Sequence, residues 1–152
     1  MSDSDLIKLY SGRILELAAE IPHTGRLPAP QGSARRRSPL CGSTVTVDVV
    51  LDAGRVAGFA QDVKACALGQ AAASVMGRAL TGRSRAEVEA GRDALRAMLK
   101  DEGPVPAAPW DGFEVLLPAR DYRNRHASIL LAMEAAAEAV ALAEGAVAAA
   151  QG

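Results

Sequence analysis

The sequence has few aromatic side chains and no excess of charge of either sign. Aromatic residues make up 3% of the chain, whereas hydrophobic residues make up 49%. A core of large rings is therefore excluded, and we expect one built from Ala, Val and Leu. The 17 basic and 18 acidic residues leave a formal net charge of −1. This balance lacks the basic footprint of a nucleic-acid binder, so we expect no nucleic-acid partner.

Long apolar runs and a secretion signal are also missing. No run approaches the roughly 18 residues that a membrane span needs, and the opening "MSDSDLIKLY" lacks a charged-then-apolar signal pattern. We therefore expect a cytoplasmic protein without membrane contact. In that reducing compartment, two cysteines are expected to act as metal ligands, nucleophiles or small buried residues in preference to forming a disulfide.

The length of 152 residues fits a single domain over 1–152, on the prior of roughly 100–200 residues per domain. Apolar residues recur at spacings of three and four from Leu6 to Ile21, which predicts an amphipathic helix that Pro22 ends. The segment 22–39 is rich in Pro, Gly and Arg. We expect it to be a connector that finishes in an edge strand.

A hairpin is predicted in the middle of the chain. Apolar and polar residues alternate over Val45–Leu51, the period of a half-buried strand. Asp52–Gly54 predicts the loop of an antiparallel hairpin, and Arg55–Lys64 the returning strand. From Ala67 the period becomes helical, and Gly82 is the expected stop.

Further helical segments complete the chain. Ser84 and Glu87 predict a capping box at the start of a helix that Gly103 breaks, and a loop around Trp110 follows. A last long helix is predicted from near Arg123, and its 127–152 part is rich in Ala. One hairpin among four or five helical segments predicts an α+β fold. We expect a small three-stranded antiparallel sheet packed against several helices, with a long C-terminal helix.

Cysteine and histidine, which suit soft metal ions and nucleophilic chemistry, occur twice each. Cys41 precedes the predicted hairpin, Cys66 opens the next helix, and His126 lies in the first turn of the last helix. Their spacing matches no general zinc motif. A helix N-terminus favours the thiolate, the form that binds metal or attacks sulfur, so Cys66 is expected to be activated. The three residues are candidate ligands of one metal ion.

The segment "SPLCGSTVTVDVV" and the helix "CALGQAAAS" together resemble the U-type iron–sulfur cluster scaffold family, which includes IscU, SufU and the N-terminal domain of NifU. Pro39, Cys41 and Gly42 match a turn in which proline precedes Cys-Gly-Asp by two residues. Cys66 matches the second cysteine of the family, which opens a helix of small residues and serines. The resemblance covers about Leu6 to Leu131, because "LIKLYSGRILELA" and "RHASILLAMEAA" resemble the family's first and last helices.

The resemblance implies a scaffold that is not a conventional enzyme. The long interval between Cys66 and His126, with its extra loop, resembles the SufU branch, which implies zinc as cofactor and sulfur transfer from a cysteine desulfurase. The family as a whole implies a bound 2Fe–2S cluster and apo iron–sulfur proteins as acceptors. Cys41, Cys66 and His126 are the implied ligands. Cys41 is also the implied sulfur acceptor, because its glycine-flanked turn is flexible.

Two positions depart from the family pattern. Ser43 stands where the family has the Asp of Cys-Gly-Asp, so a carboxylate ligand is absent. The family's third cysteine falls within "RHAS", where this chain has no cysteine. The alignment leaves three registers open, which place His126, Ala127 or Ser128 at that position.

Three functions follow from these observations. The first is a cluster scaffold or zinc-dependent sulfur acceptor, in which Cys66→Ser should lose metal and Cys41→Ser should lose sulfur acceptance. The second is a family member without a cluster that binds or regulates a partner enzyme, which the two departures favour. The third is a Cys–His enzyme in which His126 activates Cys66, although the sequence offers no third orienting group.

Overall fold

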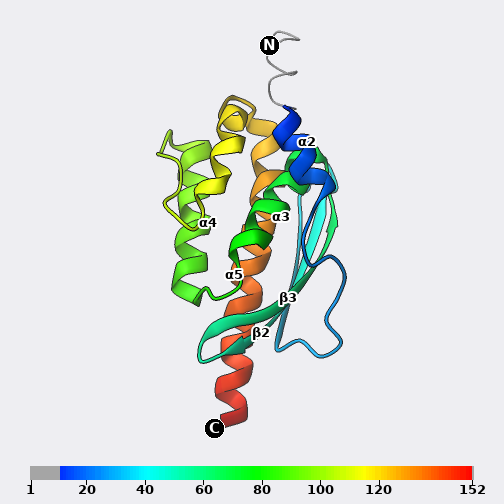
Figure 1. Ribbon diagram of the computed structural model, residues 1–152, viewed down its shortest axis with the longest axis vertical. Coiled ribbons are helices and arrows are strands. Elements are labelled where there is room, and N and C mark those ends of the chain that lie inside the picture. The colour runs from blue at the N-terminus through cyan, green and yellow to red at the C-terminus, as the bar shows by residue number, and fades with distance from the viewer. Residues whose placement is uncertain (1–10, 152) are drawn as a thin grey trace.

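A three-stranded sheet and one long helix organise the protein (Figure 1). The computed structural model describes residues 11–151. The α+β class, the three-stranded antiparallel sheet and the long C-terminal helix are confirmed. The elements are, in order, α2 (Gly12–Ala19), β1 (Gly32–Arg37), β2 (Thr44–Asp52), β3 (Arg55–Lys64), α3 (Ala67–Ala79), α4 (Arg85–Lys100), the 3₁₀ helix η1 (Asp111–Asp121) and α5 (Arg123–Gln151).

The sheet is an antiparallel meander in the order β1-β2-β3. Val47 in the central strand pairs with Ala34 of β1 and Gln61 of β3. The β2–β3 hairpin is confirmed, with its loop reduced to two residues. Ala53 and Gly54 have φ values of 52° and 77°, and two successive residues with positive φ match the twist of the flanking strands. The predicted edge strand is β1.

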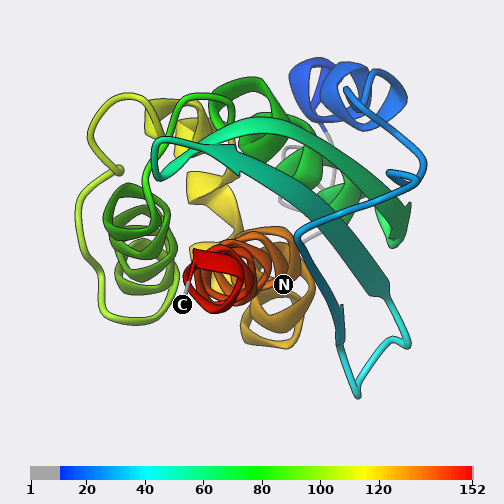
Figure 2. The same cartoon turned by 90° about the horizontal axis from the view of Figure 1, so that it is seen from below.

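The helix α5 lies at the centre of the molecule, as the view in Figure 2 shows. It contacts β1 and β2 on one side and α3 and α4 on the others. Alanines line these contacts, and Ala135, Ala136, Ala139 and Ala143 have no exposed surface. Small side chains let the backbones approach closely: a Cβ atom at Gly32 of β1 would overlap the carbonyl of Ala139. The Ala-rich composition therefore builds the core contact between helix and sheet.

The outer helices end where local sequence signals predict. In α2, Ile14 and Leu17 are buried, and the helix ends before Pro22. Leu6 and Tyr10, predicted to extend this apolar stripe, lie outside the described residues. The capping box of Ser84 and Glu87 at the start of α4 is present.

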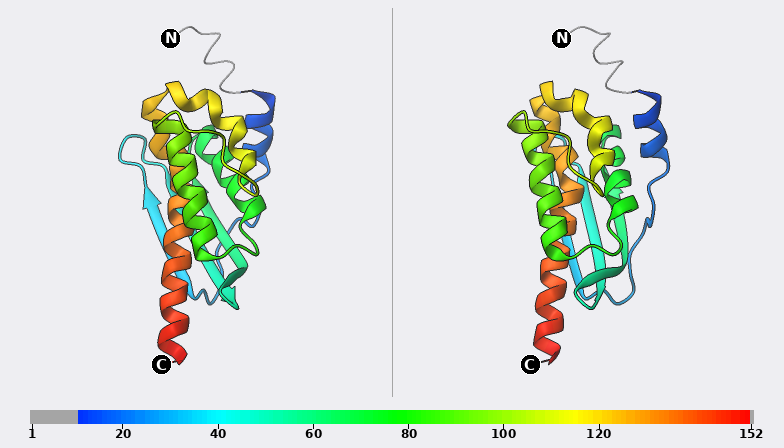
Figure 3. Two further views of the ribbon diagram at one scale, coloured as in Figure 1. Left: turned by 90° about the vertical axis from the view of Figure 1, so that its left-hand side faces the viewer. Right: turned by 60° about the vertical axis from the view of Figure 1, so that its left-hand side comes forward.

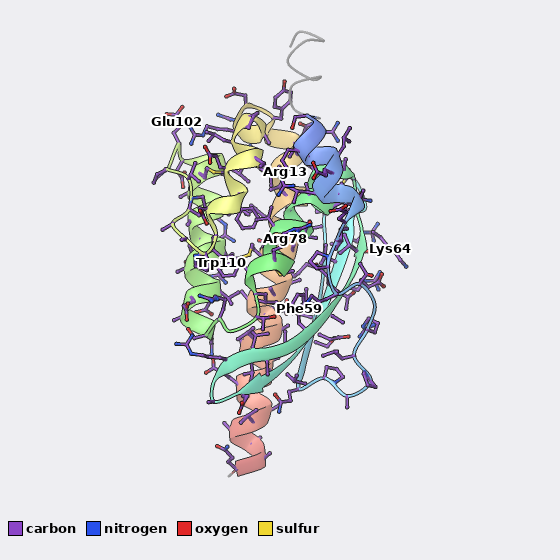
Figure 4. The ribbon with its side chains drawn as sticks, in the orientation of Figure 1. Arg13, Phe59, Lys64, Arg78, Glu102 and Trp110 are labelled. Atoms are coloured by element: carbon purple, nitrogen blue, oxygen red, sulfur yellow. The ribbon has the colours of Figure 1, made fainter. Side chains whose placement is uncertain are left out.

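The segment before α5 contains an element that the sequence did not predict. The 3₁₀ helix η1 follows the expected loop, and its Phe113 and Leu116 are fully buried. Trp110 lies between this segment and α4 (Figure 4), where its Nε1 donates a 3.1 Å hydrogen bond to the carbonyl of Glu87. None of the helices within residues 11–151 is both long and apolar enough to cross a membrane.

Candidate functional site

Cys41 lies at the tip of the short loop that joins β1 to β2. This loop passes beside the start of α5, as the left view of Figure 3 shows. Backbone hydrogen bonds from Ser38 N to Ser43 O (2.8 Å) and from Gly42 N to Ser38 O (2.9 Å) close it. Gly42 has φ = 70°, a value that glycine adopts without strain. Cys41 is exposed, and the side chain of Leu40 beside it is 72% exposed.

Cys66 lies at the other side of the site, as the N-cap residue of α3. Its thiol is partly exposed, and its carbonyl accepts a 2.9 Å hydrogen bond from Gln70 N. Both cysteines are free. The sequence therefore located both thiols correctly at the ends of their elements.

Two serine hydroxyls connect the two thiols. The Cys41 sulfur lies 2.9 Å from Ser43 Oγ, and the Cys66 sulfur lies 3.3 Å from Ser128 Oγ. Ser128 Oγ donates to Ser43 Oγ across 3.4 Å. Both serines are buried, with 5% and 2% of their surface exposed. A continuous chain of polar contacts thus runs from one thiol to the other.

Gly69 of α3 makes room for the Ser128 hydroxyl. A Cβ atom at Gly69 would lie 2.8 Å from Ser128 Oγ and 2.8 Å from the Cβ of Ala65. Real Cβ atoms do not approach this closely, so any larger residue at Gly69 would displace Ser128. The close approach of α3 to α5 at this glycine therefore determines where Ser128 lies.

The hydroxyls around Cys41 favour its thiolate. Hydrogen bonding to Ser43, and next to Ser38, lowers the pKa of the Cys41 thiol from the ordinary 9.0 to about 7. Near pH 7 about half of the Cys41 side chains are therefore thiolate, the nucleophilic form. The sequence had predicted an activated thiol at Cys66 from the helix N-terminus. A neighbouring hydroxyl is the main cause of the lowered pKa of Cys41, and the activation expected at Cys66 stays a prediction.

His126 lies away from the two thiols. Its Nε2 is 3.1 Å from the carbonyl oxygen of Ala119 and 2.9 Å from that of Arg120, so the ring joins α5 to η1. Within residues 11–151, no three His, Cys, Asp or Glu side chains form a group that could hold a metal ion. Helical geometry explains why His126 and Ser128 face different ways: residues two apart on an α-helix are rotated by about 200° about its axis. Because Ser128 faces the thiols, His126 faces away, and its role as a ligand stays a prediction.

The donor set does not fit a resident zinc ion. Structural and catalytic zinc sites use Cys, His, Asp and Glu as protein ligands, almost always three or four of them. Here the cluster offers two thiols, Cys41 and Cys66, and two neutral hydroxyls, Ser43 and Ser128. Of the three registers open for the third-cysteine position, the structure places Ser128 between the thiols. Sequence reasoning considered Ser43 and Ser128 but missed Ser38, because no sequence pattern marks that serine.

No protein-family model matches the chain, and no curated protein sequence matches it significantly. Solved structures do match. The crystal structure of a nitrogen-fixing NifU-like protein (N-terminal) from Brucella abortus has a TM-score of 0.89 and 43% sequence identity. The match covers 93% of this chain and 98% of that one.

Two further structures share the fold at lower identity. One is a hypothetical protein with a TM-score of 0.77 at 24% identity, covering 88% of this chain and 97% of that one. The other is a putative SUF-system iron–sulfur cluster assembly scaffold from Fervidobacterium islandicum, with a TM-score of 0.77 at 18% identity, covering 87% and 96%. These likenesses show the fold alone, so the SufU branch stays a prediction.

The sheet, the central helix and the thiol at the end of the β1–β2 loop define a small α+β protein of the U-type. At 43% identity over nearly its whole length, the chain belongs to the family of NifU-like N-terminal domains. The family expected from "SPLCG" and "CALGQAAAS" is therefore confirmed.

Proposed function

We propose that this chain takes part in iron–sulfur cluster assembly as a sulfur acceptor, with Cys41 as the accepting residue and a cysteine desulfurase as the donor. The observation that carries the proposal is the state of Cys41. Its thiol is exposed at a loop tip, and its pKa is lowered to about 7. The family supports the same assignment, and the SUF-system neighbour is described as a cluster assembly scaffold.

Transfer of sulfur from the desulfurase to Cys41 needs no oxidant, reductant or other reactant. The Cys41 thiolate attacks the terminal sulfur of a cysteine persulfide on the desulfurase. A new S–S bond forms to Cys41, the donor's S–S bond breaks, and the donor cysteine leaves as a thiolate. No net oxidation or reduction occurs. Exposed Leu40 beside Cys41 offers apolar surface for contact with the donor.

Cys66 supplies the second thiol of the site. An iron–sulfur unit would be the cargo of this site, and iron–sulfur units are held by thiolates. Cys66 is anchored as the N-cap residue of α3, whereas Cys41 lies on a loop. We therefore assign cargo binding to Cys66 and sulfur uptake to Cys41.

A second candidate is a partner-binding or regulatory protein that carries no cluster. The observation that favours it is the pair of hydroxyls, Ser43 and Ser128, between the thiols, where the donor set does not fit zinc. Such a protein would contact the same partner through the loop of Leu40 and Cys41 without accepting sulfur.

Sulfur uptake separates the two candidates. The purified chain is incubated with a cysteine desulfurase and cysteine, and its intact mass is measured. We expect wild type to gain sulfur, Cys41→Ser to gain none, and Cys66→Ser, the matched control, to keep the gain. If wild type gains no sulfur while it still binds the desulfurase, the regulatory function replaces the acceptor function.

A further inference from the structure

Ser38 is buried beside Cys41, and its hydroxyl has no partner. The residue is 1% exposed, and Ser38 Oγ makes no hydrogen bond within residues 11–151. Buried hydroxyls in native proteins nearly always find a partner, because an unpaired one carries a desolvation cost. The backbone of Ser38 explains its position in the loop, since its N and O bond to Ser43 and Gly42. Nothing in that backbone role requires a hydroxyl.

The unpartnered hydroxyl lies next to the sulfur of Cys41. After Ser43, the Ser38 side chain is the second largest cause of the lowered pKa of that thiol, so it interacts with the Cys41 sulfur when that sulfur is charged. Ser43 Oγ already contacts the Cys41 sulfur at 2.9 Å. The side chain that still has a hydrogen bond to give is therefore Ser38. An atom added to the Cys41 sulfur would be a suitable acceptor.

We propose that Ser38 is a positioning residue that receives the terminal sulfur of a Cys41 persulfide, in a hydroxyl-lined pocket that works without a metal ion. Ser43 Oγ contacts the Cys41 sulfur, and Ser128 Oγ donates to Ser43 Oγ from the side of Cys66. This inference rests on the proposed function, because it requires that Cys41 carry sulfur. It adds which group holds that sulfur.

The chemistry of the terminal sulfur fits a hydroxyl donor. Persulfide sulfur carries negative charge, and hydrogen bonds to a charged acceptor are about twice as strong as neutral ones. Among the residues that the structure describes, Ser38 Oγ has no hydrogen-bond partner, and its side chain favours negative charge on the Cys41 sulfur. A donor that binds the charged terminal sulfur more strongly than the unloaded thiol shifts the equilibrium toward the loaded state. Ser38 therefore favours retention of sulfur.

Loading with inorganic polysulfide tests this inference without any desulfurase. The Cys41 thiolate attacks a terminal polysulfide sulfur, gains one sulfur atom, and releases a polysulfide that is one atom shorter. The equilibrium fraction of loaded Cys41 is measured by intact mass for wild type, Ser38→Ala and Ser38→Thr. We expect Ser38→Ala to lower the loading constant about tenfold, and Ser38→Thr to restore it because it keeps the hydroxyl.

Three controls separate positioning by Ser38 from a structural or a metal-dependent role. Ser74 is a buried serine of α3 whose hydroxyl bonds to the carbonyl of Glu20, so Ser74→Ala should leave loading unchanged. Ser38→Ala removes a hydroxyl that has no partner, so its thermal stability should not fall. Loading with a chelator present should equal loading without it.

Each outcome decides between the two proposals. If Ser38→Ala loads like wild type, or if a chelator abolishes loading of wild type, the hydroxyl pocket is wrong even where desulfurase transfer succeeds. If polysulfide loads wild type and depends on Ser38, but a desulfurase transfers no sulfur, the pocket stands and the proposed function is wrong.

Discussion

Removing the Ser43 hydroxyl should change how the reactivity of Cys41 depends on pH. The hydrogen bond to Ser43 is the main cause that lowers the pKa of the Cys41 thiol from 9.0 to about 7. In Ser43→Ala the thiolate loses this partner, so its pKa should rise toward 9.0. The exposed position of Cys41 keeps the reagent's access the same in both proteins.

The structure sets the size of the change. At pH 7 a thiol with a pKa of about 7 is about half ionised, and one with a pKa of 9.0 is about 1% ionised. A full reversal would therefore lower the thiolate fraction about 50-fold. Each thiolate would become about eight-fold more nucleophilic, since reactivity rises with pKa with a coefficient of about 0.4–0.5. The net loss at pH 7 is then at most about six-fold.

Above both pKa values the order should reverse. Near pH 10 both thiols are largely ionised, and the variant's more basic thiolate should react faster than wild type by up to about eight-fold. The two pH profiles should therefore cross. A change in access or folding would shift the rate in the same direction at every pH and would produce no crossing.

The assay is thiol–disulfide exchange with a chromogenic aromatic disulfide, followed by stopped flow between pH 5 and 10. Both proteins carry Cys66→Ser, so that only Cys41 reacts. Wild type should reach half of its maximal rate near pH 7. A wild-type midpoint near 9, or a Ser43→Ala profile that coincides with that of wild type, would refute the assignment of Ser43 as the activating group.

Two further predictions concern stability, measured by urea unfolding. Asp48→Asn should lower the free energy of unfolding by about 1–3 kcal/mol at pH 7, because the fully buried Asp48 carboxylate accepts bonds from Arg26 (2.7 Å) and Ser33 (2.6 Å). Burial raises the pKa of Asp48, but these bonds outweigh it and hold the pKa below 3.8. The contribution is therefore present above pH 3.8 and lost as the pH falls through the lower folded value, and equal stabilities at pH 7 would contradict it. Gly32→Ala should lower the free energy of unfolding by about 1–3 kcal/mol, because the added Cβ atom would push β1 away from the backbone of α5. The control Gly145→Ala should not lower it, because nothing lies within 4 Å of the added Cβ atom. Equal effects of the two substitutions would contradict this account.

The order of the elements could be predicted because each has a local cause. Alternation over Val45–Leu51 identified β2, and Ser84 with Glu87 identified the start of α4. The 3₁₀ helix η1 was missed, because Phe113 and Leu116 are held by tertiary burial and not by a repeating local pattern. Local periodicity does not reveal an element that packing alone stabilises.

The residues of the site were only partly predictable from the sequence. The sequence did not show which side chains of α5 point toward the two thiols. The sequence placed Cys41 and Cys66 at the ends of their elements, and the structure connects them through two hydroxyls. It could not decide among His126, Ala127 and Ser128, and the first and last of these, two residues apart, lie on nearly opposite faces of α5. At the face that meets the thiols, Gly69 of α3 leaves room for Ser128, because a Cβ atom there would lie 2.8 Å from Ser128 Oγ.

The activation of Cys41 shows that a side-chain hydrogen bond can lower the pKa of a thiol that lies outside a helix N-terminus. A helix N-terminus contributes an effect typically worth about 0.3–1 kcal/mol at an exposed position. A hydrogen bond to a charged group contributes about 1.5–3 kcal/mol. The Ser43 hydroxyl, 2.9 Å from the Cys41 sulfur, is of the second kind. Ser43 therefore supplies a hydroxyl beside the Cys41 sulfur, at a place where a carboxylate could bind a metal ion. A hydroxyl there stabilises a thiolate, but it is not among the usual protein ligands of zinc.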